Sequence, residues 1–179
     1  MNLRTDQDLL ARVLALPSYP VGDGSDAEAA EGAIVTVPAS YIDENGHMNI
    51  QWFFKLGAWA PWLHLQELGI ADDAYLEQRR VSFFTVEHHI RYLSELREGE
   101  RFSVRTAFAG RTAKALHAVA FVVDETRERL ACVLEVMYVH VSLDERRATP
   151  IPDDVLPALD ADLARHPWVA DVATGLSLR

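Results

Sequence analysis

The chain has 179 residues, enough for one domain with a hydrophobic core and too few for two domains of ordinary size. Its formal net charge of −10 argues against a nucleic-acid binder, because phosphate contacts need a basic surface. Cys132 is the single cysteine, which excludes an intrachain disulfide and a metal site built on two cysteines. No apolar run has the length of a membrane span, and the N-terminus lacks the apolar core of a secretory signal. We therefore expect a cytoplasmic protein that contacts neither a membrane nor nucleic acid.

The beginning of the chain predicts a short amphipathic helix followed by a linker. Thr5 can cap a helix over residues 5–16, in which leucine and valine side chains share one face. Prolines and a run rich in Gly, Asp and Ala then indicate a linker that continues to Gly32. We assign residues 1–31 to this N-terminal helix and linker, and expect a short strand at residues 34–37.

A long apolar helix is predicted over residues 49–68. Apolar side chains occur around much of its circumference, which is typical of a buried helix. Pro61 is expected to kink this helix or to begin a second segment, and Gly69 is expected to end it.

From residue 81 the hydrophobic period changes to two, which predicts β-structure. Short turns join the expected strands into an antiparallel meander. These strands are expected at residues 81–92, 102–109, 115–123 and 130–141. A sheet curled around one apolar helix would bury both, so we predict an α+β fold over residues 32–145. Residues 146–179 are expected to form a C-terminal tail with a short helix around residues 153–165.

The segment DENGHMN, residues 43–49, places polar residue types directly before the long helix. A carboxylate close to a histidine can activate water, and free N–H groups at a helix start can stabilise negative charge on a carbonyl oxygen. Both are useful in thioester hydrolysis, where the thiolate leaves without a strong proton donor. The alternative is that Asp43 or Asn45 merely caps the helix. The two roles can coexist in one segment.

Together with the aromatic helix and the meander, this segment resembles the hotdog-fold thioesterases. It has the D-x-x-G pattern of the 4-hydroxybenzoyl-CoA thioesterase group and the D-x-N-x-H-x-N pattern of acyl-ACP thioesterases. Its pairing with FFTVEHHIRYLSELREGE resembles the betainyl-CoA thioesterase group associated with carnitine breakdown. The resemblance implies a hotdog fold, an antiparallel sheet wrapped around a long central helix. It also implies an acyl-CoA substrate, no metal or other cofactor, and a homodimer or homotetramer with its pocket at the dimer interface.

The resemblance implies roles for single residues. Asp43 is expected to be the catalytic carboxylate, either as a general base for water or as the nucleophile. His47 and Asn49 are expected to orient the substrate or the water. Groups that hold the thioester carbonyl or position the substrate, including backbone amides at the start of the helix, are expected at Asn45, Gly46 and Met48.

Two positions depart from the family pattern. Ile50 and Phe53 stand where many members have a second asparagine and a tyrosine. The missing hydroxyl removes a polar contact from the acyl pocket, which keeps open a non-catalytic acyl-CoA binder. A hotdog hydratase or dehydratase is a further alternative, although it would need its base beside the α or β carbon of the acyl group.

Other candidate binding residues come from the helix, the strands and a turn. The carboxylate of Glu87, with aromatic rings nearby, would suit a quaternary ammonium group. The alternative is that Glu87 and His89 are solvated. The acyl pocket is expected at Trp52, Phe53, Phe84 and Glu87.

The phosphates of coenzyme A are expected to meet cations on a strand and in the turn GRTAK. The candidates are Arg91, Arg111 and Lys114, and the alternative for the turn is simple solvation. His88 and His89 point to opposite faces of a strand, so they do not share a metal ion easily.

The remaining candidates have structural interpretations. His117 and His140 are interpreted as hydrogen-bonded strand histidines, and Cys132 as a buried strand residue that is not a nucleophile. A dimer is also expected on physical grounds, because the last long strand would otherwise expose an edge.

Overall fold

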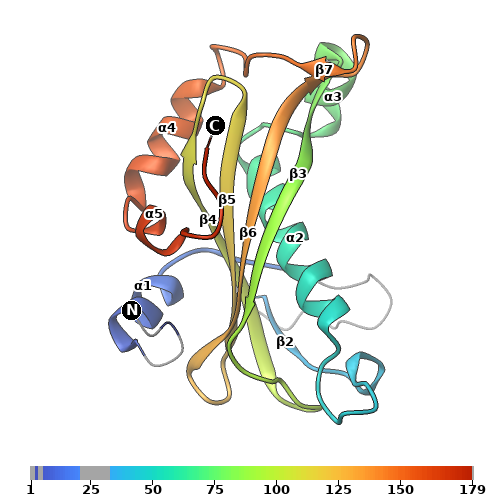
Figure 1. Cartoon of the computed structure of the whole chain (residues 1–179), viewed down its shortest axis with the longest axis vertical. Helices are drawn as coiled ribbons and strands as arrows, with labels where there is room; N and C mark the ends of the chain where they lie inside the picture. The colour runs from blue at the N-terminus through green and yellow to red at the C-terminus, as the bar shows by residue number, and fades with distance from the viewer. Residues whose placement is uncertain (1–2, 4–5, 21–32, 179) are drawn as a thin grey trace. The chain divides into compact units, whose positions relative to one another are not determined.

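The computed structural model describes residue 3 and residues 6–20 and 33–178 (Figure 1). The chain forms two compact units. Unit 1 comprises Met1–Ala60, Ile90–Thr106 and Ala120–Leu134, and unit 2 comprises Pro61–His89, Ala107–Val119 and Glu135–Arg179. The expected linker over residues 21–32 lies outside the described residues, and the expected domain bounds at residues 32 and 145 stay predictions.

Four long strands make up most of the sheet (Figure 1), and the residue range of each falls partly in unit 1 and partly in unit 2. They are β3 (Val81–Tyr92), β4 (Arg101–Arg111), β5 (Ala115–Asp124) and β6 (Arg129–Ser142), close to the expected bounds. The order in the sheet is β1-β4-β5-β6-β3, with β2 also on β4 and β7 on β6. The short strands are β1 (Ser18–Tyr19), β2 (Ile34–Thr36) and β7 (Arg147–Ala148).

The prediction that the last long strand exposes an edge is wrong. Strand β6 is covered by β5 on one side and by β3 on the other. Strand β3 is instead the end of the order among the described strands. The pairing of β3 with β6 joins segments far apart in the sequence, and the pattern of a single strand does not reveal it.

In unit 1, the N-terminal helix α1 (Gln7–Leu14) has the expected amphipathic character. Leu9, Leu10 and Val13 are buried. The Asp6 carboxylate caps the helix by accepting a hydrogen bond from the amide of Leu9 at 2.9 Å. The expected cap, Thr5, lies outside the described residues.

The helix α2 (Ile50–Glu67) is continuous through Pro61, so no second segment begins there. Gly69 follows the helix with a φ of +71°, and its left-handed backbone explains the predicted stop. The predicted burial on all sides is wrong for the single chain, because Ile50, Phe54 and Trp59 are 60%, 45% and 52% exposed. A sheet buries only the helix face that packs on it, and in unit 1 that close approach is made at Gly57, beside Leu134.

Unit 2 contains three short helices: α3 (Asp73–Arg79), α4 (Leu156–Arg165) and α5 (Val169–Val172). The helix expected around residues 153–165 is confirmed as α4. His140 is confirmed as a hydrogen-bonded strand histidine, with Nε2 2.9 Å from the Tyr75 hydroxyl and Nδ1 3.1 Å from the Thr149 carbonyl oxygen. No helix in the described part of the chain is long and apolar enough to cross a membrane.

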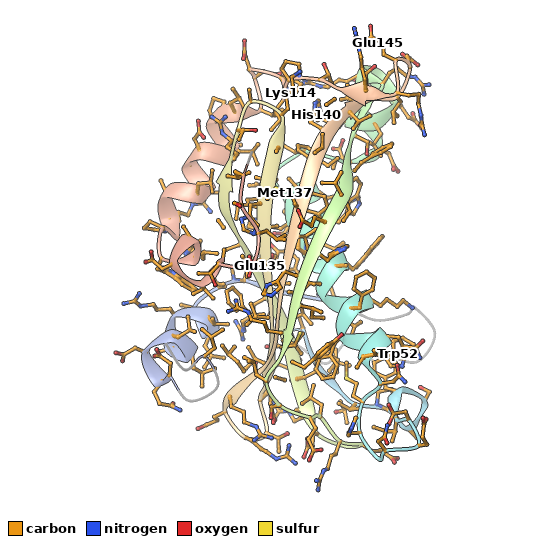
Figure 2. The ribbon with its side chains drawn as sticks, viewed as in Figure 1. Trp52, Lys114, Glu135, Met137, His140 and Glu145 are labelled. Atoms are coloured by element: carbon orange, nitrogen blue, oxygen red, sulfur yellow. The ribbon has the colours of Figure 1, made fainter. Side chains whose placement is uncertain are left out.

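A buried carboxylate on β6 holds the end of the chain in unit 2 (Figure 2). Glu135 accepts hydrogen bonds from the amides of Gly175 and Leu176 at 3.0 and 3.1 Å. His89 Nδ1 and His117 Nε2 lie 3.1 and 3.2 Å from its carboxylate oxygens. His117 Nε2 approaches Glu135 without hydrogen-bond geometry, so the interpretation of His117 as a hydrogen-bonded strand histidine is not confirmed. His89 binds Glu135 through Nδ1 while 39% of its side chain is exposed, so the alternative of a solvated His89 holds in part.

Replacing Gly175 with alanine is expected to loosen this anchor. An added Cβ would lie 1.7 Å from His89 Nδ1, and His89 cannot retreat without lengthening its bond to Glu135. We expect a loss of about 1–3 kcal/mol in the free energy of unfolding, as for other overpacked sites. Urea denaturation of Gly175→Ala measures it, with the exposed Ser177→Ala as the control. Equal midpoints for both variants would contradict the packing described here.

Candidate functional site

The polar segment before α2 forms a closed loop in unit 1. Ile42 and Met48 pair as an antiparallel bridge. The amide of Asp43 donates to the His47 carbonyl at 3.1 Å, and the amide of Gly46 donates to the Asp43 carbonyl at 3.0 Å. Gly46 has a φ of +77°, a conformation that glycine adopts without steric cost. The loop thus fixes the positions of its own polar side chains.

The loop gathers the three predicted catalytic residues. The Asp43 carboxylate accepts from the Asn45 amide at 2.9 Å and from Asn49 Nδ2 at 3.3 Å. His47 Nδ1 lies 3.9 Å from Asp43 Oδ1 and 3.4 Å from the Met48 carbonyl oxygen. Asp43 is mostly covered, with 11% of its side chain exposed, against 33% for His47. This geometry brings Asp43, His47 and Asn49 together, while their roles stay predictions.

The cap of α2 is Asn49, which corrects the alternative that Asp43 or Asn45 caps the helix. Asn49 Oδ1 accepts a hydrogen bond from the Gln51 amide at 3.0 Å. The helix begins at Ile50, so Asp43 and Asn45 precede it by several residues. Asn49 therefore serves two purposes: it caps the helix with its oxygen and holds Asp43 with its nitrogen.

The structure also corrects the prediction of which backbone amides hold the thioester carbonyl oxygen. The Met48 amide donates to the Leu96 carbonyl at 2.7 Å, and the Gly46 amide is used inside the loop. Among the described residues, the amides of His47 and Ile50 have no hydrogen-bond acceptor. Ile50 is the first residue of α2, where the helix dipole adds partial positive charge. The sequence signal that could have identified it is the asparagine cap directly before it.

An open pocket of about 640 Å³ lies beside this loop in unit 1. His47 and Ile50 line it, together with Phe53, whose ring meets that of Tyr92 edge-on at 5.7 Å. The remaining lining residues come from the loop, the segment after β3 and the turn before β6: Met48, Leu93, Ser94, Glu95, Arg97, Arg127 and Arg129. A pocket of this size accommodates part of a small-molecule ligand.

Of the expected acyl-pocket residues, only Phe53 lines this pocket. Trp52 on α2 (Figure 2) instead stacks on Tyr41, with ring centroids 3.8 Å apart. Phe84 and Glu87 belong to unit 2, where the Arg146 guanidinium lies 5.5 Å from the Phe84 ring and Glu87 is exposed. Glu87 is therefore solvated in the single chain, as the alternative interpretation stated. The role of Glu87 in an acyl pocket stays a prediction.

The cations expected to bind coenzyme A do not line the pocket either. Both carboxylate oxygens of Asp160 accept from Arg111, at 2.6 and 2.7 Å. Lys114 Nζ lies 3.5 Å from the Ala148 carbonyl oxygen in unit 2. The pocket contains Arg97, Arg127 and Arg129, which sequence reasoning missed because the turns REGE and DETRER indicated only connections between strands.

Local electrostatics differ between the pocket and the adjacent sheet. Hydrogen bonds from Arg97 hold the pKa of Glu95 below its usual value, and the charges of Arg97, His47 and Arg127 act in the same direction. Burial raises the pKa of Cys132 to about 12, so its thiol stays protonated, as expected of a buried strand residue. In the described ranges, no group of three or more His, Cys, Asp or Glu side chains is arranged to hold a metal ion.

The sequence of this chain is similar to a family model and to several known proteins. The family model described as Thioesterase-like superfamily matches residues 37–159. The betainyl-CoA thioesterase of Pseudomonas aeruginosa is 32% identical over 127 residues, which cover 70% of this chain and 79% of that protein. The L-carnitine dehydrogenase/betainyl-CoA thioesterase of Agrobacterium fabrum is 31% identical over 171 residues, 87% of this chain. The chain spans only 35% of the length of that second relative.

The fold also matches solved structures. A hypothetical protein from Staphylococcus aureus, solved in complex with CoA, has a TM-score of 0.62 and 23% sequence identity. The match covers 82% of this chain and 87% of that one. This likeness confirms the predicted α+β hotdog fold, with its antiparallel sheet and long helix. The chain belongs to the Thioesterase-like superfamily.

Proposed function

We propose that this protein is an acyl-CoA thioesterase, which hydrolyses an acyl-CoA to a free acid and CoA. The observation that carries the proposal is the Asp43 carboxylate, held by Asn49 beside His47 and next to a pocket at the start of α2. Family membership and the relatives named betainyl-CoA thioesterase support the same reaction.

In the proposed mechanism, Asp43 acts on the thioester carbonyl. As a general base it takes a proton from water while the water oxygen bonds to the carbonyl carbon. As a nucleophile it attacks the carbonyl carbon, the carbon–sulfur bond breaks to give an anhydride and CoA thiolate, and water then opens the anhydride. The amides of Ile50 and His47 stabilise the negative charge on the carbonyl oxygen, aided by the dipole of α2. In the general-base route the carbon–sulfur bond breaks after water has added, and CoA leaves as a thiolate. No metal or other cofactor takes part.

The proposed acyl group is betaine, as in the Pseudomonas aeruginosa relative. The rings of Phe53 and Tyr92 meet on the pocket, and aromatic faces attract a quaternary ammonium group. Glu95 adds a carboxylate to the same lining. The two rings supply an aromatic surface for a cationic acyl chain, while the Glu95 carboxylate is paired with Arg97 at 2.6 Å.

The proposed assembly is a homodimer, or a homotetramer built from it, in the cytoplasm. Large apolar side chains are exposed on α2 at Ile50, Phe54 and Trp59, and on β3 at Val86 and Tyr92. Strand β3 also ends the strand order of the described sheet. An exposed strand edge and exposed apolar residues are both features that association with a second copy covers.

Product analysis separates this proposal from its alternatives. The protein is incubated with betainyl-CoA, with an uncharged saturated acyl-CoA and with a 2-enoyl-CoA in ¹⁸O-labelled water, and the products are identified by mass spectrometry. A thioesterase yields free CoA and an acid that contains the label, with betaine as the best acid product. A hydratase returns an acyl-CoA heavier by one water, and a non-catalytic binder returns the acyl-CoA unchanged. Either of these last two results would contradict the proposal.

A further inference from the structure

Three arginines line the pocket of unit 1 outside the proposed catalytic groups. Arg97 lies in the loop after β3, and Arg127 and Arg129 lie at the turn between β5 and β6. His47 lines the same pocket, so the guanidinium groups and the proposed reacting groups share one open space. None of the three arginines takes part in the hydrolysis described above.

Neighbouring carboxylates fix the orientation of these arginines. Arg97 binds Glu95 at 2.6 Å, and Arg129 Nε binds Asp124 at 3.1 Å. The Asp124 carboxylate is buried and also accepts from the amides of Thr126 and Arg127 at 3.1 and 3.0 Å, so it is a rigid support.

Arg127 contacts both of the segments that carry the three arginines. Its guanidinium lies 3.4 Å from Asp124 and also pairs with Glu100. It donates to the Glu95 carbonyl at 3.4 Å as well. Arg127 therefore connects the loop after β3 to the turn before β6 within unit 1.

These ion pairs leave part of the guanidinium groups of Arg97 and Arg129 available to a ligand, whereas both Nη groups of Arg127 are engaged. Arg97 uses Nε and Nη2, and Arg129 uses Nε. Within the described ranges, Arg97 Nη1 and both Nη groups of Arg129 have no acceptor. Three carboxylates, Glu95, Glu100 and Asp124, balance the three cations, so recognition rests on directed N–H donors rather than on net charge. Oriented guanidinium donors match phosphate oxygens well.

Building on the proposed function, we propose that Arg97 and Arg129 bind the phosphate groups of the CoA nucleotide, while Arg127 holds together the two segments that carry them. An acyl-CoA carries its thioester at one end of a flexible pantetheine arm and its phosphates at the other. A pocket that contains both His47 and free guanidinium donors suits those two ends. Arg111 is a weaker candidate, because Asp160 already occupies its fork with both oxygens.

The test measures nucleotide recognition apart from catalysis. The affinity for 3′-phosphoadenosine 5′-phosphate is measured by calorimetry for the wild type, Arg97→Gln and Arg129→Lys. Arg129→Lys keeps the charge beside buried Asp124, which protects the fold, but removes the fork of donors. Arg101→Gln, exposed at the start of β4 and absent from the pocket lining, is the matched control. We expect about 10- to 100-fold weaker binding for the two pocket variants and no change for the control.

Kinetics provide a second readout. For both pocket variants, KM is expected to rise with an acyl-CoA, whereas kcat/KM for the matching acyl-pantetheine, which lacks the nucleotide, should equal that of the wild type. Unchanged affinity for the bisphosphate in both variants, or equal losses with the two substrates, would overturn the inference. If the protein released no thiol but the pocket variants still lost bisphosphate affinity, the proposed hydrolysis would fail and the nucleotide site would stand.

Discussion

Replacing Asp43 with asparagine is expected to lower kcat for thiol release by about 10²- to 10⁴-fold, the usual contribution of a positioned general base. The amide has nearly the shape of the carboxylate, and its oxygen can still accept from the Asn45 amide. The hydrogen bond from Asn49 Nδ2 is lost, but the backbone hydrogen bonds of the loop remain, so the loop is expected to keep its form. The substitution removes the ionised carboxylate, which either takes a proton from water or attacks the carbonyl carbon. KM is expected to change little, because the pocket lining does not include Asp43.

The matched control is Glu44→Gln, which removes the neighbouring carboxylate in the same loop. Glu44 is exposed, and neither the pocket lining nor the hydrogen bonds of Asp43 involve it. Steady-state kinetics and circular dichroism of both variants separate loss of chemistry from loss of fold. A folded Asp43→Asn protein with wild-type kcat would remove Asp43 from the mechanism.

The second large effect concerns stability. Glu135→Gln is expected to lower the free energy of unfolding by about 3 kcal/mol at pH 7. Burial acts to raise the pKa of Glu135, but the adjacent His117 and hydrogen bonds with His89 and the amides of Gly175 and Leu176 together lower it from 4.5 to about 2. The folded state therefore favours the charged form. Glutamine would also turn an amide N–H₂ toward groups that donate hydrogen bonds.

The sign of the pH dependence follows from this lowered pKa. The stabilisation by ionised Glu135 is fully present above the unfolded pKa of about 4.5 and is lost as the pH falls toward the folded value of about 2. Urea denaturation of the wild type and Glu135→Gln at several pH values between 7 and 3 is expected to show a difference that narrows below pH 4.5. Glu145→Gln, exposed in the same unit, serves as the control. A difference that does not vary with pH would contradict the anchor described for Glu135.

Local sequence signals were sufficient for the four long strands and for the polar loop, but not for the two-residue strands β1 and β7. The period of two predicted β3 to β6 because it reports burial on alternate sides, and the spacing from Asp43 to Asn49 is short enough for one loop to bring the side chains together. The start of α2 was placed near its true position, but the cap and the free amide at Ile50 depend on hydrogen bonds that only coordinates define.

Features that depend on contacts between distant segments could not be predicted from the sequence. Glu135 stands in an apolar strand, and its partners are His89 and the amide of Gly175, 46 and 40 residues away. The arginines of the pocket come from two separate segments, and the sequence of neither segment indicates that both line the same pocket. The exposure of apolar residues on α2 could not be predicted for the same reason. A sequence pattern shows that a helix is apolar, but it does not show which faces of the helix the rest of the chain covers.

The proposed thioesterase activity is tested most directly by the rate of free-thiol release when the purified full chain is incubated with a panel of acyl-CoAs that includes betainyl-CoA. We expect saturable release in proportion to enzyme concentration, fastest with betainyl-CoA. Tight binding of acyl-CoA with no thiol release from any member of the panel would contradict it and would make the protein an acyl-CoA binder.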